Sequence, residues 1–168
     1  REPDMSNFFA ELEAGFKNHA DQPALILSGQ DDWSYAELLL QINRAAAELA
    51  AIGAGAGDRV LVQLPKSSEN LALYLACLKL GLVYVPLNTG YTAAELDYFV
   101  SDAEPVLYVG EHYRSDVVSA TLETRDAERL LVFSKGVSTS DDLALPLTAV
   151  RATDDLAAIL YTSGTTGN

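Results

Sequence analysis

Short apolar runs alternate with longer segments of helical periodicity along most of this 168-residue chain. The apolar runs predict strands at residues 24–27, 59–64, 83–87, 106–109 and 130–133. Helices are expected at residues 6–20, 34–52, 67–80, 92–102 and in a short segment after Tyr113. Because alternating strands and helices form largely parallel sheets covered on both faces, the pattern predicts an α/β fold.

Two of the expected helices begin with a Ser/Thr-x-x-Glu pattern. Ser34 precedes Glu37 by three residues, and Thr92 precedes Glu95 by the same spacing. In such a capping box the hydroxyl and the carboxylate each accept a hydrogen bond from a free backbone N–H. The spacing therefore predicts helix starts at both places.

Three closely spaced glycines, Gly53, Gly55 and Gly57, raise the question of a dinucleotide-binding loop. Such a loop follows a strand and opens a helix, whereas these glycines follow a helix and precede a strand. We interpret them as a helix-ending turn.

The segment from Tyr161 to Asn168 is rich in glycine and hydroxyl groups and directly follows an apolar run, 156–160, that predicts a buried strand. Glycines let the backbone turn several N–H groups toward one point, and hydroxyl side chains add neutral donors around it. Groups of this kind hold a polyphosphate. The candidate phosphate-binding residues are Thr162, Ser163, Gly164, Thr165, Thr166 and Gly167.

Two other interpretations of this segment are weaker. A flexible Ser/Thr/Gly linker has the same composition, but a linker has no reason to follow a buried strand. A nucleotide-hydrolase Walker loop requires the spacing Gly-x-x-x-x-Gly-Lys-Ser/Thr, which the sequence lacks.

Residues 161–167 resemble the phosphate-binding loop of the adenylate-forming enzymes, the acyl-CoA synthetase and ligase superfamily. In that family a variable residue and Pro-Lys-Gly follow, and Asn168 takes the variable position. Three more segments match the family in order. They are the aromatic-Ser-Tyr-x-Glu-Leu helix start at 33–38, the Gly-Asp-Arg-Val turn at 57–60, and the segment 81–87, which runs from a glycine after a helix to Val-Pro-Leu. The resemblance thus covers nearly the whole chain.

The resemblance implies a ligase that activates a carboxylic acid with ATP and Mg²⁺ and transfers the acyl group to CoA. Residues 1–168 would be the N-terminal part of the AMP-binding domain, an incomplete part of the large N-terminal domain that ends inside the phosphate-binding loop. The family's loop lysine, adenine- and ribose-binding groups, Mg²⁺-binding glutamate and C-terminal catalytic lysine would all follow Asn168. We therefore expect no catalytic residue and no metal ligand in this chain, which should be inactive without the rest of its longer parent.

The sequence also bears on which carboxylic acid the ligase would activate. Residues 87–92, 95–99 and 102–105 look most like the malonyl-CoA synthetase branch, which implies malonate. Another acyl- or aryl-CoA ligase and an amino-acid adenylation domain are alternatives, because the residues that line the acid pocket would lie downstream. A third alternative is not an enzyme: a non-catalytic folding or interaction module that shares the fold of these ligases.

Charge and composition exclude several other functions. The chain has a net charge of −13 with only 11 Lys and Arg, which argues against nucleic acid as a partner. Cys77 lies in an apolar helix and is expected to be a small buried hydrophobe. His19 and His112 have no cysteine or second histidine near them in the sequence, so neither is expected to bind a metal.

The apolar stretch 71–87 is the segment that most resembles a membrane span. Lys79, Gly81 and Pro86 interrupt it before about 20 apolar residues accumulate, so no span is expected. The first residues lack the charged-then-apolar pattern of a secretory signal, and we expect a cytoplasmic protein.

Overall fold

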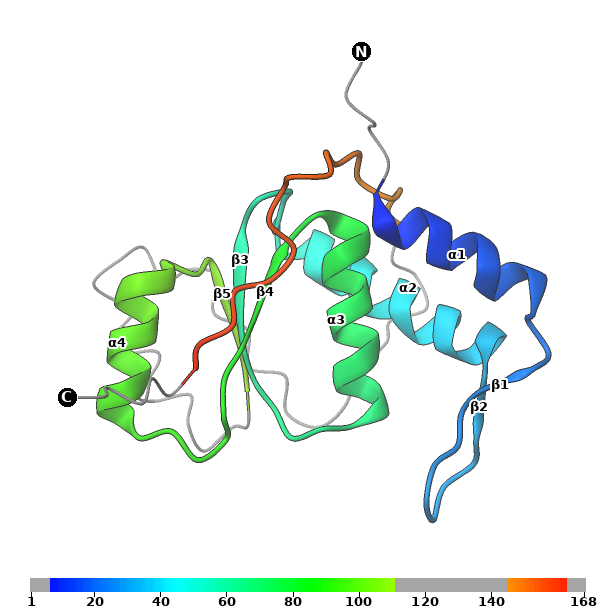
Figure 1. Ribbon diagram of the computed structural model, residues 1–168, viewed down its shortest axis with the longest axis horizontal. Coiled ribbons are helices and arrows are strands. Elements are labelled where there is room, and N and C mark those ends of the chain that lie inside the picture. Colours follow the sequence, from blue (N-terminus) through cyan, green and yellow to red (C-terminus); the bar gives the residue numbers. More distant parts are fainter. Residues whose placement is uncertain (1–6, 111–144, 163–168) are drawn as a thin grey trace.

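The computed structural model describes residues 7–110 and 145–162 and has a parallel sheet flanked by helices (Figure 1). The predicted helix after Tyr113 and the predicted strand at 130–133 lie outside the described residues. The elements in chain order are α1 (Phe8–Asn18), β1 (Pro23–Leu25), β2 (Trp33–Ser34), α2 (Tyr35–Ala51), β3 (Arg59–Gln63), α3 (Ser68–Leu80), β4 (Val83–Pro86), α4 (Ala93–Ala103) and β5 (Leu107–Gly110).

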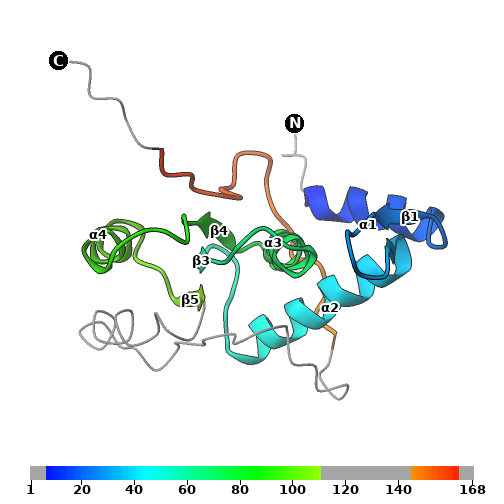
Figure 2. The ribbon, with the colours of Figure 1, turned by 90° about the horizontal axis from the view of Figure 1, so that it is seen from below.

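The main sheet has the order β4-β3-β5, and both pairings are parallel. The chain first steps from β3 to β4 and then returns across β3 to β5. Because crossovers between parallel strands are right-handed, this reversal places α3 and α4 on opposite faces of the sheet. Figure 2 shows α4 on one side of the three strands, with α3 and α2 on the other. The α/β fold with helices on both faces is thus confirmed.

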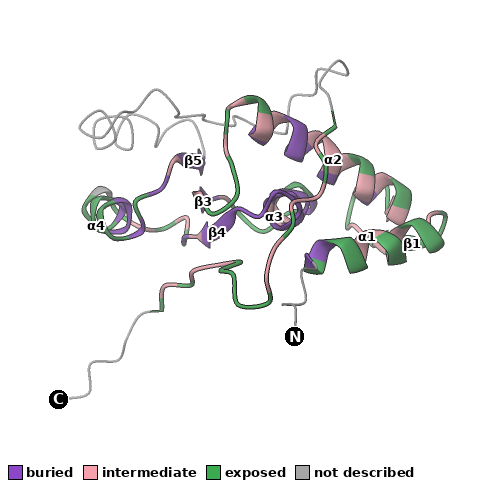
Figure 3. Cartoon of the chain, turned by 90° about the horizontal axis from the view of Figure 1, so that it is seen from above, coloured by how far each residue is buried: buried purple, intermediate pink, exposed green. Residues whose placement is uncertain are grey.

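Alternating residues of the central strand β3 enter two separate cores. Val60 and Val62 pack against α2 and α3, whereas Leu61 faces the side of α4. Such alternation follows from the two-residue period of a strand. Figure 3 shows that the buried residues concentrate in the sheet and on the helix faces next to it. The core on the α4 side comprises Leu61, Val83, Val85, Leu87, Leu96, Phe99, Val100, Ala103 and Tyr108.

The two predicted capping boxes have different outcomes. At α4 both bonds are present: Glu95 N donates to Thr92 Oγ1 at 3.4 Å, and Thr92 N donates to Glu95 Oε2 at 2.7 Å. At α2 Ser34 accepts the bond from Glu37 N, but the Glu37 carboxylate accepts from Gln41 Nε2 at 2.6 Å instead. The capping box of α2 is therefore only half formed, because the side-chain amide of Gln41, one turn along the helix, forms a hydrogen bond with the Glu37 carboxylate.

Trp33 and Ser34 also form a strand that the sequence did not predict. They pair antiparallel with β1 in a separate two-stranded sheet. A two-residue strand is too short to show the alternation by which strands are recognised.

A buried lysine joins the first three helices. Lys79 Nζ donates to Asn43 Oδ1 at 2.9 Å, and it lies 3.8 Å from Glu13 Oε1 and 5.6 Å from the centre of the Phe9 ring. Burial alone would raise the pKa of Glu13, but the hydrogen bond from Lys17 and the charge of Lys79 outweigh it and lower that pKa. A charge this deeply buried persists only when it is paired, so the contact fixes α1, α2 and α3 to one another.

In the described residues, none of the helices has the length and apolar character needed to cross a membrane.

Candidate functional site

The segment that leads into the candidate phosphate-binding residues lies beside β4. Tyr84 N donates to Ala157 O at 3.0 Å, and Ile159 N donates to Tyr84 O at 3.1 Å. These bonds form a single parallel bridge between Tyr84 and Ala158. The backbone at 156–160 therefore extends the sheet locally, as Figures 1 and 2 show on the β4 side.

The expectation of a buried strand at 156–160 is wrong in part. The segment pairs at one position only, and the Leu156 and Leu160 side chains are 55% and 71% exposed. Its paired neighbour is β4, through Tyr84. Ala158 and Ile159 pack against the two cores, on opposite sides of the sheet.

The direction of this segment bears on what can bind there. Because this segment runs parallel to β4, it carries the chain from Ala158 to Thr162 in the direction of the carboxyl ends of the parallel strands. Ligands of open α/β sheets bind outside those ends, where connections leave toward opposite faces. The connections after β3 and β4 diverge in this way, since α3 and α4 lie on opposite faces.

Thr162 is the one predicted phosphate-binding residue that the structure places. It is exposed and follows Tyr161 directly. Ser163, Gly164, Thr165, Thr166 and Gly167 lie outside the described residues. Their role as phosphate-binding groups therefore stays a prediction.

Side chains of α4 hold Tyr161, the residue before the candidate site. Tyr161 Oη donates to Asp102 Oδ2 at 2.6 Å, and its ring lies 4.5 Å from the Phe99 ring and 6.4 Å from the Tyr98 ring, centre to centre. Burial, then the bond to Asp102 and the charge of that carboxylate, raise the pKa of Tyr161 to about 12. The phenol thus stays protonated at neutral pH and keeps its donor.

A buried polar cluster ties together the carboxyl ends of the strands. Gln63, 1% exposed at the end of β3, accepts a hydrogen bond from Tyr108 Oη at 2.7 Å and donates one to Asn88 O at 2.9 Å. The cluster joins β3, β5 and the connection after β4. Sequence reasoning missed it, although a single glutamine within the apolar run at 59–64 was a signal.

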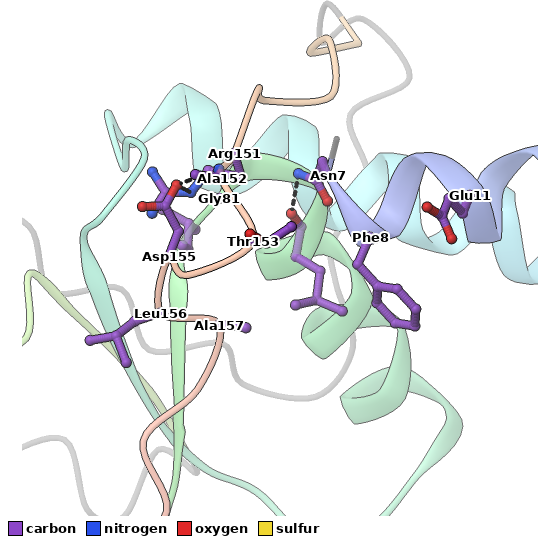
Figure 4. Close-up of a pocket in the computed structure, with 12 residues that line it drawn as sticks. Asn7, Phe8, Glu11, Gly81, Arg151, Ala152, Thr153, Asp155, Leu156 and Ala157 are labelled. Carbon is purple, nitrogen blue, oxygen red and sulfur yellow. Dashed lines mark hydrogen bonds and ion pairs between the residues drawn. The ribbon is translucent and has the colours of Figure 1, made fainter. Parts of the chain in front are cut away.

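A pocket of about 290 Å³ lies elsewhere, between the start of α1, the end of α3 and residues 151–157 (Figure 4). Arg151 Nε pairs with Asp155 Oδ2 at 3.1 Å on its wall, and Asn7 Nδ2 donates to Leu78 O at 2.8 Å. Gly81 and Leu82 line it just before β4 begins. The pocket is therefore at the opposite end of β4 from Thr162 and is separate from the candidate site.

The expectation for Cys77 is confirmed. It is fully buried within α3, and burial raises the pKa of its thiol to about 12, so it is no nucleophile at neutral pH. Within residues 7–110 and 145–162, no three His, Cys, Asp or Glu side chains gather as metal ligands would. His19 caps the end of α1, and His112 lies outside the described part of the chain.

Solved structures match the fold over nearly its whole length. Apo MatB from Rhodopseudomonas palustris has a TM-score of 0.83 and 39% identity, covering 96% of this chain and 33% of that one. ATP-bound MatB from the same organism has a TM-score of 0.78 and 40% identity, covering 94% and 33%.

Curated relatives agree with this match. An uncharacterized acyl-CoA ligase of Bacillus subtilis, YtcI, is 34% identical over 147 residues, which are 82% of this chain and 27% of that protein. The L-proline–[L-prolyl-carrier protein] ligase of Pseudomonas fluorescens is 34% identical over 148 residues, 84% of this chain and 29% of that protein. The chain thus spans about a third or less of each of these four proteins.

The family assignment follows from a match over nearly all of the sequence. The sequence pattern of the AMP-binding enzyme family fits residues 12–168, which include every segment on which the resemblance to adenylate-forming enzymes rests. This chain belongs to the AMP-binding enzyme family.

Proposed function

We propose that residues 1–168 are the N-terminal part of an AMP-binding domain in an ATP-dependent acid–thiol ligase, here called the parent. The observation that carries the proposal is the Thr162–Gly167 sequence at the end of a segment aligned with a parallel sheet, in a chain of this family. The similarity to ATP-bound MatB supports ATP as the nucleotide.

The reaction has two steps that make a poor electrophile reactive. A free carboxylate resists thiols because its charge deactivates the carbonyl and its leaving group would be oxide. A carboxylate oxygen therefore attacks the α-phosphorus of ATP, the bond to the bridging oxygen breaks, and pyrophosphate leaves. The CoA sulfur then attacks the acyl carbon of the adenylate, the bond to the AMP oxygen breaks, and the thioester forms.

The residues of this chain would bind and orient the phosphates. Hydroxyls of Thr162, Ser163, Thr165 and Thr166 would donate to the β- and γ-phosphate oxygens, and Gly164 and Gly167 would let backbone N–H groups approach. Phosphoryl transfer needs positioning and charge stabilisation more than covalent help from the protein. Mg²⁺, bound with ATP, would neutralise phosphate charge that a chain of net charge −13 otherwise repels.

The acid that we propose is malonate, because residues 87–92, 95–99 and 102–105 resemble the malonyl-CoA synthetase branch. An amino-acid or other acyl substrate is the second candidate, and the identity of 34% to the proline ligase and to the acyl-CoA ligase favours it. We also propose a cytoplasmic location, where ATP and CoA are both available.

A panel of acids tests this choice on the purified parent. We expect thioester formation with ATP, Mg²⁺ and CoA to be fastest with malonate among malonate, acetate, octanoate, coumarate and proline. Residues 1–168 alone serve as a control and should form none, since the groups for adenine and the acid are expected after Asn168. Much faster activation of another acid would contradict malonate and leave the ligase assignment standing.

A further inference from the structure

Residues 156–160 lie at the edge of the main sheet, on the far side of β4 from β3 (Figure 1). The segment is bonded to β4 through Ala157 O and Ile159 N. The alternate residues, whose backbone groups face away from β4, are Leu156, Ala158 and Leu160. Within the part of the chain that the structure describes, no backbone hydrogen bond is made to these three residues. The edge therefore presents a short row of unpaired donors and acceptors.

The same edge is apolar on one face. Ala158 packs against the core on the side of α2 and α3, whereas Ile159 and Tyr161 pack against the core on the side of α4. Because side chains alternate in this way, Leu156 and Leu160 share the face of Ala158. These leucines are 55% and 71% exposed. Charged residues and proline commonly protect sheet edges, and residues 156–160 contain neither.

The sequence of this edge is complementary to itself in one antiparallel register. If a twofold axis relates two copies at Ala158, Leu156 of each copy lies opposite Leu160 of the other. The four leucines then form two cross-strand apolar pairs on one face of the joined sheet. Ala158 lies opposite its own counterpart, and the two alanines exchange N–H···O bonds. The register thus pairs the unpaired backbone groups and covers the exposed leucines together.

The charges beside the edge permit this register. Asp154 and Asp155 precede the segment, and Asp155 is already paired with Arg151 at 3.1 Å. Antiparallel pairing brings these two aspartates toward Tyr161 and Thr162 of the second copy, whereas parallel pairing would bring them toward the same two aspartates. Each copy has a net charge of −13, so the copies repel at long range and added salt should strengthen their association.

We propose that residues 156–160 are a self-association edge, at which two copies of this chain pair as antiparallel strands and join their sheets into one. The inference does not depend on the proposed ligase function. Because the paired segment is short, the pair is weak, with a dissociation constant on the order of 10–100 µM. Each leucine that is exposed in one copy is covered by a leucine of the other.

Sedimentation velocity of residues 1–168 over a series of protein concentrations tests the proposal. We expect a monomer–dimer equilibrium for the wild-type chain. Leu156→Asp and Leu160→Lys should each be monomeric, because each change places a charge opposite a leucine. Leu147→Asp alters a leucine that is 89% exposed outside the edge, so this matched control should dimerise as wild type. Because all three leucines are exposed, the melting temperatures should change by less than about 3 °C.

Mixing the two charged variants tests the antiparallel register. The aspartate that one variant carries at position 156 then lies opposite the lysine that the other carries at position 160, and the remaining two leucines pair. The mixture should therefore dimerise although neither variant does so alone. Wild-type association of either charged variant, loss of association in Leu147→Asp, or a monomeric mixture would overturn the inference. A wild-type chain that stays monomeric at every concentration would overturn it as well.

Discussion

Replacing Gly164 by valine in the parent is expected to slow adenylate formation by about two orders of magnitude, and Thr165→Val by a similar factor. The valine side chain obstructs the approach of the backbone to the phosphates, and the second change removes one hydroxyl donor. Loss of one preorganised transition-state donor costs roughly 3 kcal/mol in comparable sites. Single-turnover measurements of adenylate formation would give the rates directly.

Matched controls separate this effect from general damage. Gly15→Val changes an exposed glycine of α1 around which nothing lies within 4 Å of an added Cβ. Thr153→Val removes a hydroxyl from an exposed threonine that lines the pocket at the opposite end of β4 from Thr162. Both controls should retain wild-type rates. Unchanged rates in both loop variants would remove residues 162–167 from the mechanism.

Truncating Leu61 to alanine is expected to lower the free energy of unfolding of the chain by about 3 kcal/mol. Leu61 is 0% exposed in the central strand and packs on the side of α4. Its removal leaves a cavity where neighbouring strands and the helix cannot easily collapse, so the loss of burial and the cavity both contribute. Urea unfolding followed by circular dichroism would measure the change.

Leu40→Ala in α2 is the control for this truncation. Leu40 is 43% exposed, so the same chemical change should cost less than about 1 kcal/mol. If the two variants unfolded at the same urea concentration, the assignment of Leu61 to the core would be wrong.

Much of the fold was predictable because its signals are local. Helix starts at Ser34 and Thr92 follow from caps within three residues, and both are observed. Gly81 ends α3 with a φ of 70°, a backbone conformation that glycine adopts without strain. Among the described residues, hydrophobic periodicity predicted the remaining helices and the strands β1, β3, β4 and β5 to within a few residues.

The features that the sequence did not predict depend on contacts that no local pattern specifies. No local pattern indicates that 156–160 pairs at one position only, since its apolar run suits a buried strand equally well. The half-formed cap of α2 depends on competition by Gln41 for the Glu37 carboxylate. In the site, the loop residues could be chosen from their sequence alone, whereas the bond of Tyr161 to Asp102 requires the fold that brings them together.

We propose that this chain belongs to an enzyme that activates a carboxylic acid as its adenylate. Exchange of labelled pyrophosphate into ATP by the parent, without CoA, tests that step alone. We expect exchange that requires Mg²⁺ and an acid, that is fastest with malonate, and that is lost in Gly164→Val. Absence of exchange with every acid of the panel, or an exchange rate indifferent to added acid, would contradict it.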